Sequence, residues 1–376
     1  MRPSIVPPAI ASLPWQVILP LTALVVFGAA VLYSAAGGHM QPYAESHLVR
    51  FVVFLLMALI MARFPQDIVK LAAYPVYIAV LFLLILVETL GAIGGGSQRW
   101  LDLGFIVLQP SEFMKPAIVL VLARFYSTLP ANMVGNWRSL IPAGALIGLP
   151  VVLVLLQPDL GTGLAITFGG VVIMFMAGLP FRWFAAAGGA MLVVGPLAYF
   201  FALHDYQRRR VTTFLDPESD PLGAGYHITQ SKIAIGSGGI TGKGFGQGSQ
   251  SHLNYLPEPH TDFVFATMSE EWGLLGGLLV LAIFAIVLRW GLSVASRAPD
   301  RFSRLLAVGM TVTIFFYIAI NLMMVMGLAP VVGIPLPFMS HGGSSMLTNM
   351  LCVGTLMMVD RWSRKAGGRS LSPFGG

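Results

Sequence analysis

Several long uncharged hydrophobic runs leave this chain few folds, because in lipid only helices and closed barrels satisfy all their backbone hydrogen bonds. The first run extends from Trp15 to Ala36 without a charged residue, which is long enough to cross ~30 Å of hydrocarbon. Nine further runs follow, at about 48–64, 71–90, 106–127, 139–157, 160–180, 184–204, 272–289, 305–326 and 338–359. We therefore expect an all-α integral membrane protein with about ten transmembrane helices, forming a single polytopic membrane domain over residues 1–376.

Composition supports this class, since 56% of the residues are hydrophobic and 10% are charged, against about 25% charged in soluble domains. The single cysteine, Cys352, excludes an intrachain disulfide framework. The net charge of +6 is explained by basic residues at span ends, which set topology and do not indicate a nucleic-acid partner. Two thirds of the Lys and Arg residues fall on the side of the two termini. We therefore predict cytoplasmic termini and one long extracytoplasmic loop, 205–268, between spans 7 and 8.

The 205–268 loop combines many glycines with a few ionisable residues. Nine glycines lie between Gly223 and Gly248, which suits backbone that bends sharply or approaches a ligand closely, although a flexible connector is the alternative. Within the loop, YHITQSKIAI is the one piece that could form an amphipathic helix. The segment LPEPHTDF (256–263) carries His260 and Asp262, and a carboxylate beside a histidine can act as a general base. The alternative is that Asp262 caps the following helix.

Charged residues inside the spans are costly and often functional. Glu112 and Lys115 are three residues apart, so they share a helix face and can pair. Arg99 precedes the fourth span, and Asp159 lies in QPDLGT at the hinge between spans five and six. We interpret these positions as one polar cavity open to the outer leaflet, where cations would meet an anionic head group. The alternative for Glu112 and Lys115 is a structural ion pair.

Six motifs carry a resemblance that runs from the first span to the last. They are QRWLDLG (98–104), QPSEFMK (109–115), QPDLGT (157–162), DPESDPLGAGYHITQSKIAIGSGGITGKG (216–244), LPEPHTDFVFA (256–266) and GIPLPFMSHGGSS (333–345). In these motifs the chain resembles the SEDS family (shape, elongation, division and sporulation), and within it the RodA-like branch. One position departs from the family pattern: His341 stands where an aromatic or small residue is usual.

The resemblance implies a SEDS-type fold in the bacterial cell inner membrane, with the active site facing the periplasm. It implies a peptidoglycan glycosyltransferase of cell elongation, which polymerises lipid II into glycan strands and releases undecaprenyl pyrophosphate. The HTDF aspartate, Asp262, would be catalytic. The predicted substrate-binding residues are those that match functional family positions and the basic groups near them: Arg99, Trp100, Glu112, Lys115, Asp159, Lys243 and His260. The implied partners are lipid II, the growing glycan strand, a class B penicillin-binding protein and other elongation-complex membrane proteins.

Two other functions remain open from the residues: a flippase that moves lipid II across the bilayer, and a scaffold that recruits a cross-linking partner. The chain has no P-loop and no Cys/His metal spacing, so ATP-driven transport and zinc hydrolysis lack support. No cofactor is predicted with certainty. A divalent cation, Mg²⁺ or Mn²⁺, assisting pyrophosphate departure is left open.

Overall fold

The computed structural model describes residues 13–94, 97–102, 107–201, 208, 212–214, 216, 223–253, 255–256 and 258–370. Ten helices of at least 17 residues lie in this part of the chain: α2 (Trp15–Ala35), α3 (Tyr43–Met61), α4 (Gln66–Leu90), α5 (Pro110–Thr128), α6 (Trp137–Leu156), α7 (Leu160–Met176), α8 (Phe181–Phe201), α12 (Val264–Ser296), α13 (Arg301–Val325) and α14 (Gly343–Ser370). Each of the ten predicted spans overlaps one of these helices.

Seven of the helices are long and apolar enough to cross a membrane: α2, α3, α4, α6, α8, α12 and α13. The other three differ for local reasons. Helix α5 carries Glu112 and Lys115, α7 has only 17 residues, and α14 ends in a basic segment. The predicted all-α, multi-pass membrane protein is confirmed as a fold class.

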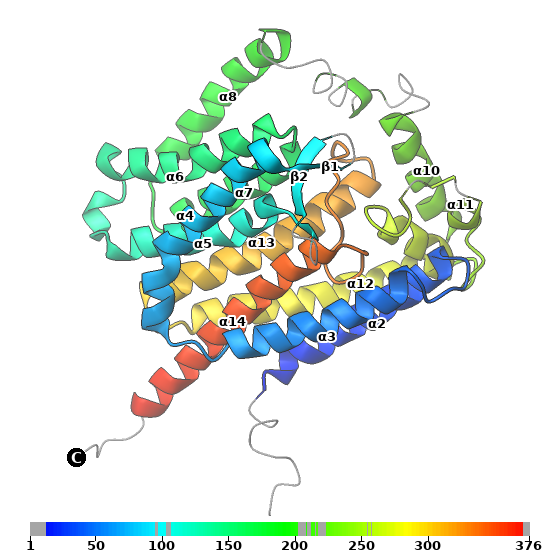
Figure 1. Ribbon diagram of the computed structural model, residues 1–376, viewed down its shortest axis with the longest axis horizontal. Helices are drawn as coiled ribbons and strands as arrows, with labels where there is room; N and C mark the ends of the chain where they lie inside the picture. The colour runs from blue at the N-terminus through cyan, green and yellow to red at the C-terminus, as the bar shows by residue number, and fades with distance from the viewer. Residues whose placement is uncertain are drawn as a thin grey trace, which may run out of the picture.

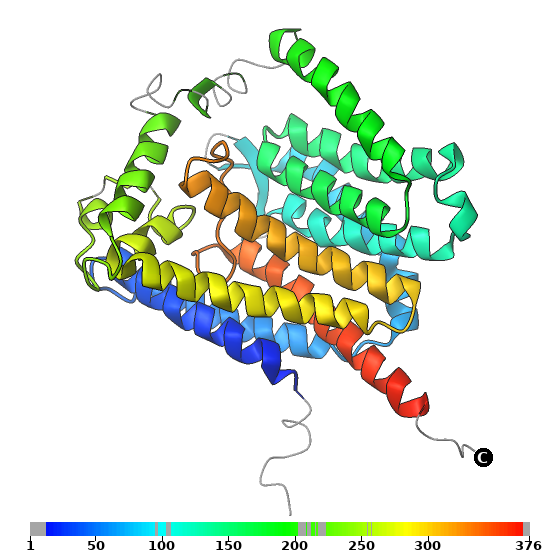
Figure 2. The same cartoon turned by 180° about the vertical axis from the view of Figure 1, so that it is seen from behind.

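Helix α13 lies at the centre of the bundle, where it packs against α5, α7, α12 and α14. Helix α2 packs on α12 and α3 packs on α14, so helices from the first and last parts of the described chain lie side by side (Figure 1). The far end of helix α8 projects away from the bundle in both views (Figures 1 and 2), while near its start Phe184 meets Phe175 of α7 edge-on. No residue of the hydrophobic window of α8 is buried, as expected for a helix that faces lipid.

A short antiparallel sheet connects α4 to α5, where the sequence predicted no strands. Its strands are β1 (Ala92–Gly94), β2 (Ser97–Asp102) and β3 (Val107–Leu108), in the order β1-β2-β3. Trp100 pairs with Ala92, and Leu101 pairs with Leu108. Helix α5 then begins at Pro110, because proline is favoured in the first turn, where its missing N–H is not needed.

Two further helices lie between α8 and α12: α10 (Ala224–Ser237) and α11 (Ser249–His252). Helix α10 contains the predicted YHITQSKIAI helix, and it packs on α12 and α13. Its Ser231 hydroxyl donates to the carbonyl of Val325 at 2.8 Å. Residues 202–207, 209–211, 215 and 217–222 lie outside the described residues, so the extent of the predicted 205–268 loop stays a prediction.

Helix α12 is interrupted at Gly273, which has φ +62° and ψ −159°. A helix break frees backbone N–H groups, which need other acceptors when they are buried. Here Leu274 N donates to Gly239 O at 2.9 Å, and Leu275 N donates to Ile240 O at 3.1 Å. The glycine-rich segment 238–248 therefore supplies hydrogen-bond acceptors for the N–H groups that the helix break leaves without one.

The same segment also donates to α12. Lys243 N bonds to Glu270 O, and Gly244 N bonds to Glu271 O, each at 3.0 Å. A Cβ at Gly242 would lie 2.0 Å from Glu271 O, so no side chain fits there. The glycines thus allow one backbone segment to lie directly against another. From the sequence we expected them to serve sharp bends or close approach to a ligand.

Candidate functional site

Asp262 lies just before α12, in the segment 256–263. Helix α12 has Phe263 as its N-cap and no side-chain capping bond, so Asp262 does not cap the helix. In the described part of the chain, no group donates a hydrogen bond to the Asp262 carboxylate. Its Oδ2 faces Gly333, where a Cβ would stand 3.5 Å away. The carboxylate is therefore half-buried yet open to a proton donor such as a hydroxyl.

The surroundings of Asp262 tune its acidity. Burial, and to a smaller extent the negative charge of Glu258, together raise the pKa of Asp262 to about 6. Burial disfavours the charged carboxylate, and so does a second carboxylate nearby. A carboxyl with a pKa close to the working pH can accept and release a proton with little cost, which suits a general base.

Asn321, fully buried on α13, fixes the backbone at Asp262. Its Nδ2 donates to Asp262 O at 2.8 Å and to Ile334 O at 2.7 Å. Both N–H groups of the amide are thereby used, and they join two segments that are distant in the sequence. Asn321 was not among the predicted site residues. Its signal is a lone amide inside an apolar run, which a hydropathy average conceals.

A cluster of rings holds the same segment from the side of α3. His341 N donates to His260 O at 2.9 Å. The His260 ring stacks on Tyr43 with 4.0 Å between centroids, and the His341 ring meets the same tyrosine edge-on. His341 Nε2 lies 3.0 Å from Arg50 Nη1. Burial and the Arg50 charge lower the pKa of His341 to about 4, so its ring is neutral and accepts that bond.

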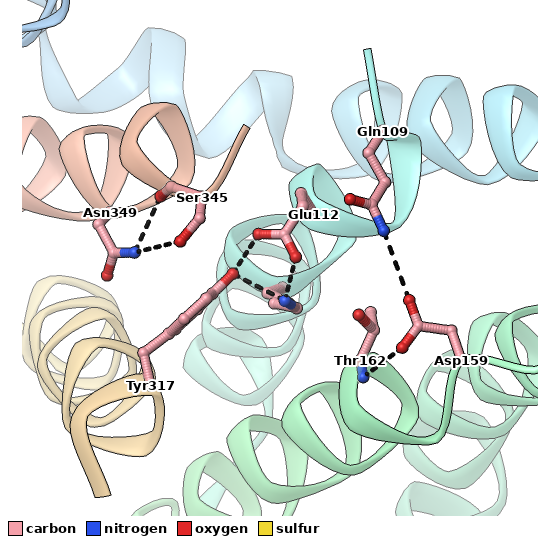
Figure 3. Close-up of polar contacts among 8 residues, drawn as sticks. Gln109, Glu112, Asp159, Thr162, Tyr317, Ser345 and Asn349 are labelled. Carbon is pink, nitrogen blue, oxygen red and sulfur yellow. Dashed lines mark hydrogen bonds and ion pairs between the residues drawn. The ribbon is translucent and has the colours of Figure 1, made fainter. Parts of the chain in front are cut away.

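Glu112 and Lys115 form a buried pair on α5, with Lys115 Nζ 2.5 Å from Glu112 Oε1. Tyr317, on α13, completes the group (Figure 3). Lys115 Nζ donates to its hydroxyl at 2.7 Å, and the hydroxyl donates to Glu112 Oε2. Both charges thus have hydrogen-bonded partners, as burial requires. Tyr317 was also missed from the sequence, because an aromatic residue in an apolar run gives no polar signal.

Asp159 and Arg99 hold the turn between α6 and α7. Asp159 Oδ1 accepts from Thr162 N at 3.0 Å as the N-cap of α7, and Gln109 Nε2 donates to Oδ2 at 3.4 Å (Figure 3). Arg99 donates to the carbonyls of Gln157 and Pro158 at 2.9 and 2.6 Å. Asp159 and Glu112 therefore lie near the same end of α5, within one connected region.

Lys243 and Trp100 occupy different places. Lys243 Nζ lies 2.6 Å from Glu270 Oε1 and donates to Ser249 Oγ at 2.9 Å, and its side chain is 31% exposed. Trp100 is half-buried in β2. The structure pairs Glu112 with Lys115, and it places the His260 ring against Tyr43 and Glu258, two residues before Asp262. It places Lys243 on the glycine-rich segment beside α12. The substrate-binding role of all seven residues stays a prediction.

A metal ion would need several His, Cys, Asp or Glu side chains that point to one place. Within the described ranges, no three His, Cys, Asp or Glu side chains are grouped so that they could hold an ion. Asp262 has one acidic neighbour, Glu258, and its histidine neighbour His260 pairs with Glu258 at 3.4 Å. The described residues do not form a protein-built divalent-ion site, so no reaction step is assigned to a metal.

The fold and site define a multi-pass membrane protein. At one end of its helix bundle lies a carboxylate with a raised pKa, and within the bundle lies a buried ion pair. A sequence profile of the FtsW, RodA and SpoVE family, described as cell cycle proteins, matches residues 11–365. The chain belongs to this family, and the SEDS resemblance is confirmed.

Its relatives share most of its length. Peptidoglycan glycosyltransferase MrdB of Escherichia coli strain K12 is 43% identical over 344 residues, covering 91% of this chain and 92% of the relative. Stage V sporulation protein E of Bacillus subtilis is 40% identical over 287 residues, covering 76% and 77%.

Solved structures of similar proteins superpose on this chain over nearly its whole length. A chain from a peptidoglycan synthase complex, described as coordinating polymerisation and crosslinking, superposes with a TM-score of 0.82 at 30% identity, covering 94% of this chain and 98% of that one. The rod shape determining protein RodA of Thermus thermophilus superposes with a TM-score of 0.71 at 28% identity, covering 94% and 98%. The chain is therefore similar over nearly its whole length to RodA proteins.

Proposed function

We propose that this protein is a peptidoglycan glycosyltransferase of cell elongation, which joins lipid II units into glycan strands. The observation that carries the proposal is the Asp262 carboxylate, which is half-buried, lacks a hydrogen-bond donor among the described residues and has a pKa raised to about 6. The name of the MrdB relative supports the same activity. The proposed substrates are lipid II as acceptor and the growing glycan strand as donor.

The reaction forms one bond and breaks one. The 4-hydroxyl of the acceptor GlcNAc attacks C1 of the donor sugar, and Asp262 takes the hydroxyl proton. The bond between C1 and the pyrophosphate oxygen breaks, and its electron pair leaves with undecaprenyl pyrophosphate. The leaving group is already an anion and needs no proton, so one carboxylate suffices, whereas glycoside hydrolases use a pair. General-base assistance of this kind contributes about 10²–10⁴ in rate.

The proposed substrate-binding residues are Arg99, Trp100, Glu112, Lys115, Asp159, Lys243 and His260. Charged groups at membrane depth are expensive, which favours a functional role for the Glu112–Lys115 pair. Lysine has three N–H donors, and Glu270 and Ser249 take two of those on Lys243. The third donor, on a side chain that is 31% exposed, is available for a phosphate oxygen.

We place the protein in the bacterial cell inner membrane, with Asp262 facing the periplasm and both termini in the cytoplasm. The charge distribution along the sequence supports this orientation. A class B penicillin-binding protein is the proposed partner, together with other elongation-complex membrane proteins. The description of the similar synthase complex, which couples polymerisation to crosslinking, supports that partner.

The test is polymerisation of purified lipid II by the solubilised protein together with its penicillin-binding partner, whose transpeptidase serine is blocked. Wild type should make glycan ladders and Asp262→Ala should make none. Asp67→Ala, at an exposed carboxylate in the first turn of α4, is the matched control and should behave as wild type. Ladders from Asp262→Ala at the wild-type rate would remove Asp262 from the mechanism.

The flippase alternative is supported by the buried charges of Glu112 and Lys115, since such groups also line transport pathways. It is tested in sealed vesicles with labelled lipid II. A flippase moves labelled lipid II across the bilayer without joining it into longer glycan chains. In that case Asp262→Ala should move the labelled lipid II as wild type does. Ladders without label movement support the glycosyltransferase.

A further inference from the structure

Asn321 makes two hydrogen bonds whose partners are both main-chain carbonyls. Nδ2 donates to Asp262 O at 2.8 Å and to Ile334 O at 2.7 Å. The amide plane fixes the angle between the two N–H groups, so the two carbonyls are held in one geometry. Because Asn321 is fully buried on the central helix α13, it gives both segments a rigid reference.

The two segments meet at the Asp262 carboxylate. The segment after Asn321 passes Gly333, whose φ of +70° turns the chain beside Asp262 Oδ2. Irregular backbone between membrane helices needs internal hydrogen-bond partners, and Asn321 provides one for each segment. A further hydrogen bond joins the same two segments. His341 N donates at 2.9 Å to the carbonyl of His260, which lies two residues before Asp262.

We propose that Asn321 is a positioning residue for Asp262: it holds the backbone of the general base, and the opposing loop at Ile334, in the geometry that the transfer requires. The inference rests on the proposed function. Asn321 bonds to the carbonyl of Asp262 and does not bond to its carboxylate, so it acts through Asp262. Displacing a catalytic group by ~1 Å can cost about 100-fold in rate.

The test compares Asn321→Leu with Asn349→Leu in glycan polymerisation from lipid II with the penicillin-binding partner. Asn349 is the matched control, because it is fully buried and, among the described residues, its amide bonds only to Ser345 within α14. Asn321→Leu should lower kcat about 10–100-fold with little change in KM. Asn349→Leu should retain the wild-type kcat. Asn321→Ser, which keeps one hydroxyl donor, should fall between Asn321→Leu and wild type.

The pH profile supplies a second readout. In Asn321→Leu the Asp262 carboxylate gains water, so the acid limb of kcat should move below the wild-type limb, while Asn349→Leu leaves it in place. Among the described residues, Glu258 is the charged group that acts on this carboxylate, and His260 on the same segment pairs with Glu258 and is joined to His341 and Arg50 across from it. All are retained in both variants. An unchanged limb together with unchanged kcat in Asn321→Leu would overturn the inference.

Hydrogen exchange measured by mass spectrometry separates this inference from the proposed function, because it needs no catalysis. Exchange in 258–263 should rise in Asn321→Leu and stay at the wild-type level in Asn349→Leu. Equal exchange in both variants would overturn the inference even if wild type polymerises lipid II. If wild type makes no glycan while Asn321→Leu alone loosens 258–263, the positioning contact stands and the proposed function fails.

Discussion

Tyr317 and Asn321 lie one helical turn apart on α13, and each holds a different part of the site. Tyr317 bonds to the Glu112–Lys115 pair, while Asn321 bonds to the backbone of Asp262. Residues four apart share a helix face. One face of the central helix therefore sets the positions of the buried pair and of the segment that carries Asp262 together.

The first prediction concerns the hydroxyl of Tyr317. Tyr317→Phe removes a partner from both charges of the buried pair, so it should lower the free energy of unfolding by about 1–3 kcal/mol. Tyr126→Phe is the control, because Tyr126 is equally buried and its hydroxyl has no partner in the described structure. Denaturant unfolding in detergent measures both. Equal losses would show that the bonds to Glu112 and Lys115 do not stabilise the fold.

The second prediction concerns the pair itself. Lys115→Met leaves Glu112 buried without its cation, which should cost about 3–5 kcal/mol of unfolding free energy. Adding Glu112→Gln removes the stranded charge and should recover much of that loss. A double-mutant cycle measures the coupling between the two positions. Additive losses would mean that the two charges do not interact.

The third prediction is a shift in pH dependence. A general base must be ionised, and Asp262 has a pKa raised to about 6, so polymerisation should fall as the pH drops through that value. Glu258→Gln removes a negative neighbour that raises the pKa of Asp262, so the acid limb should move to lower pH. Initial rates between about pH 4.5 and 8 give the profile. An acid limb that stays in place, or moves upward, would contradict the role of Glu258.

The fourth prediction separates two glycines with similar backbone conformations. Gly242 and Gly246 have φ of +81° and +73°. A Cβ at Gly242 would lie 2.0 Å from Glu271 O, whereas a Cβ at Gly246 meets nothing within 4 Å. Gly246→Ala should cost only the left-handed strain, about 1–2 kcal/mol. Gly242→Ala should cost more and should expose 238–248 to protease. Similar protease sensitivity in both variants would mean that the segment is not held against α12.

Much of the fold follows from hydropathy, because each apolar run has to satisfy its own backbone in lipid. The predicted span begins at 272, beside the break at Gly273. The helical segment before that break, from Val264, was not predicted, because Glu270 and Glu271 interrupt the apolar run. Glu270 is buried because Lys243 and Ser249 bond to it, and these contacts come from a segment that no local pattern places there. Strand β2 was missed because its partners are only two to three residues long.

The sequence singles out Asp262, Glu112 and Lys115 because they are ionisable residues in or beside apolar runs, and their roles stay predictions. The sequence does not single out the residues that orient them. Asn321 and Tyr317 matter through their hydrogen bonds to other segments, and only the packing of α13 brings those segments within reach. A hydropathy reading averages such residues with their apolar neighbours.

Arg301 bears on how the chain is assembled. At the start of α13 its guanidinium donates to Leu129 O at 2.8 Å and to Ala177 O at 2.9 Å, closing the ends of α5 and α7. Translation proceeds from the N-terminus, and Arg301 lies 124 residues beyond Ala177. Neither carbonyl can have this partner until the ribosome has made the first turn of α13. The contact that closes the ends of α5 and α7 therefore depends on a residue that is synthesised after both helices.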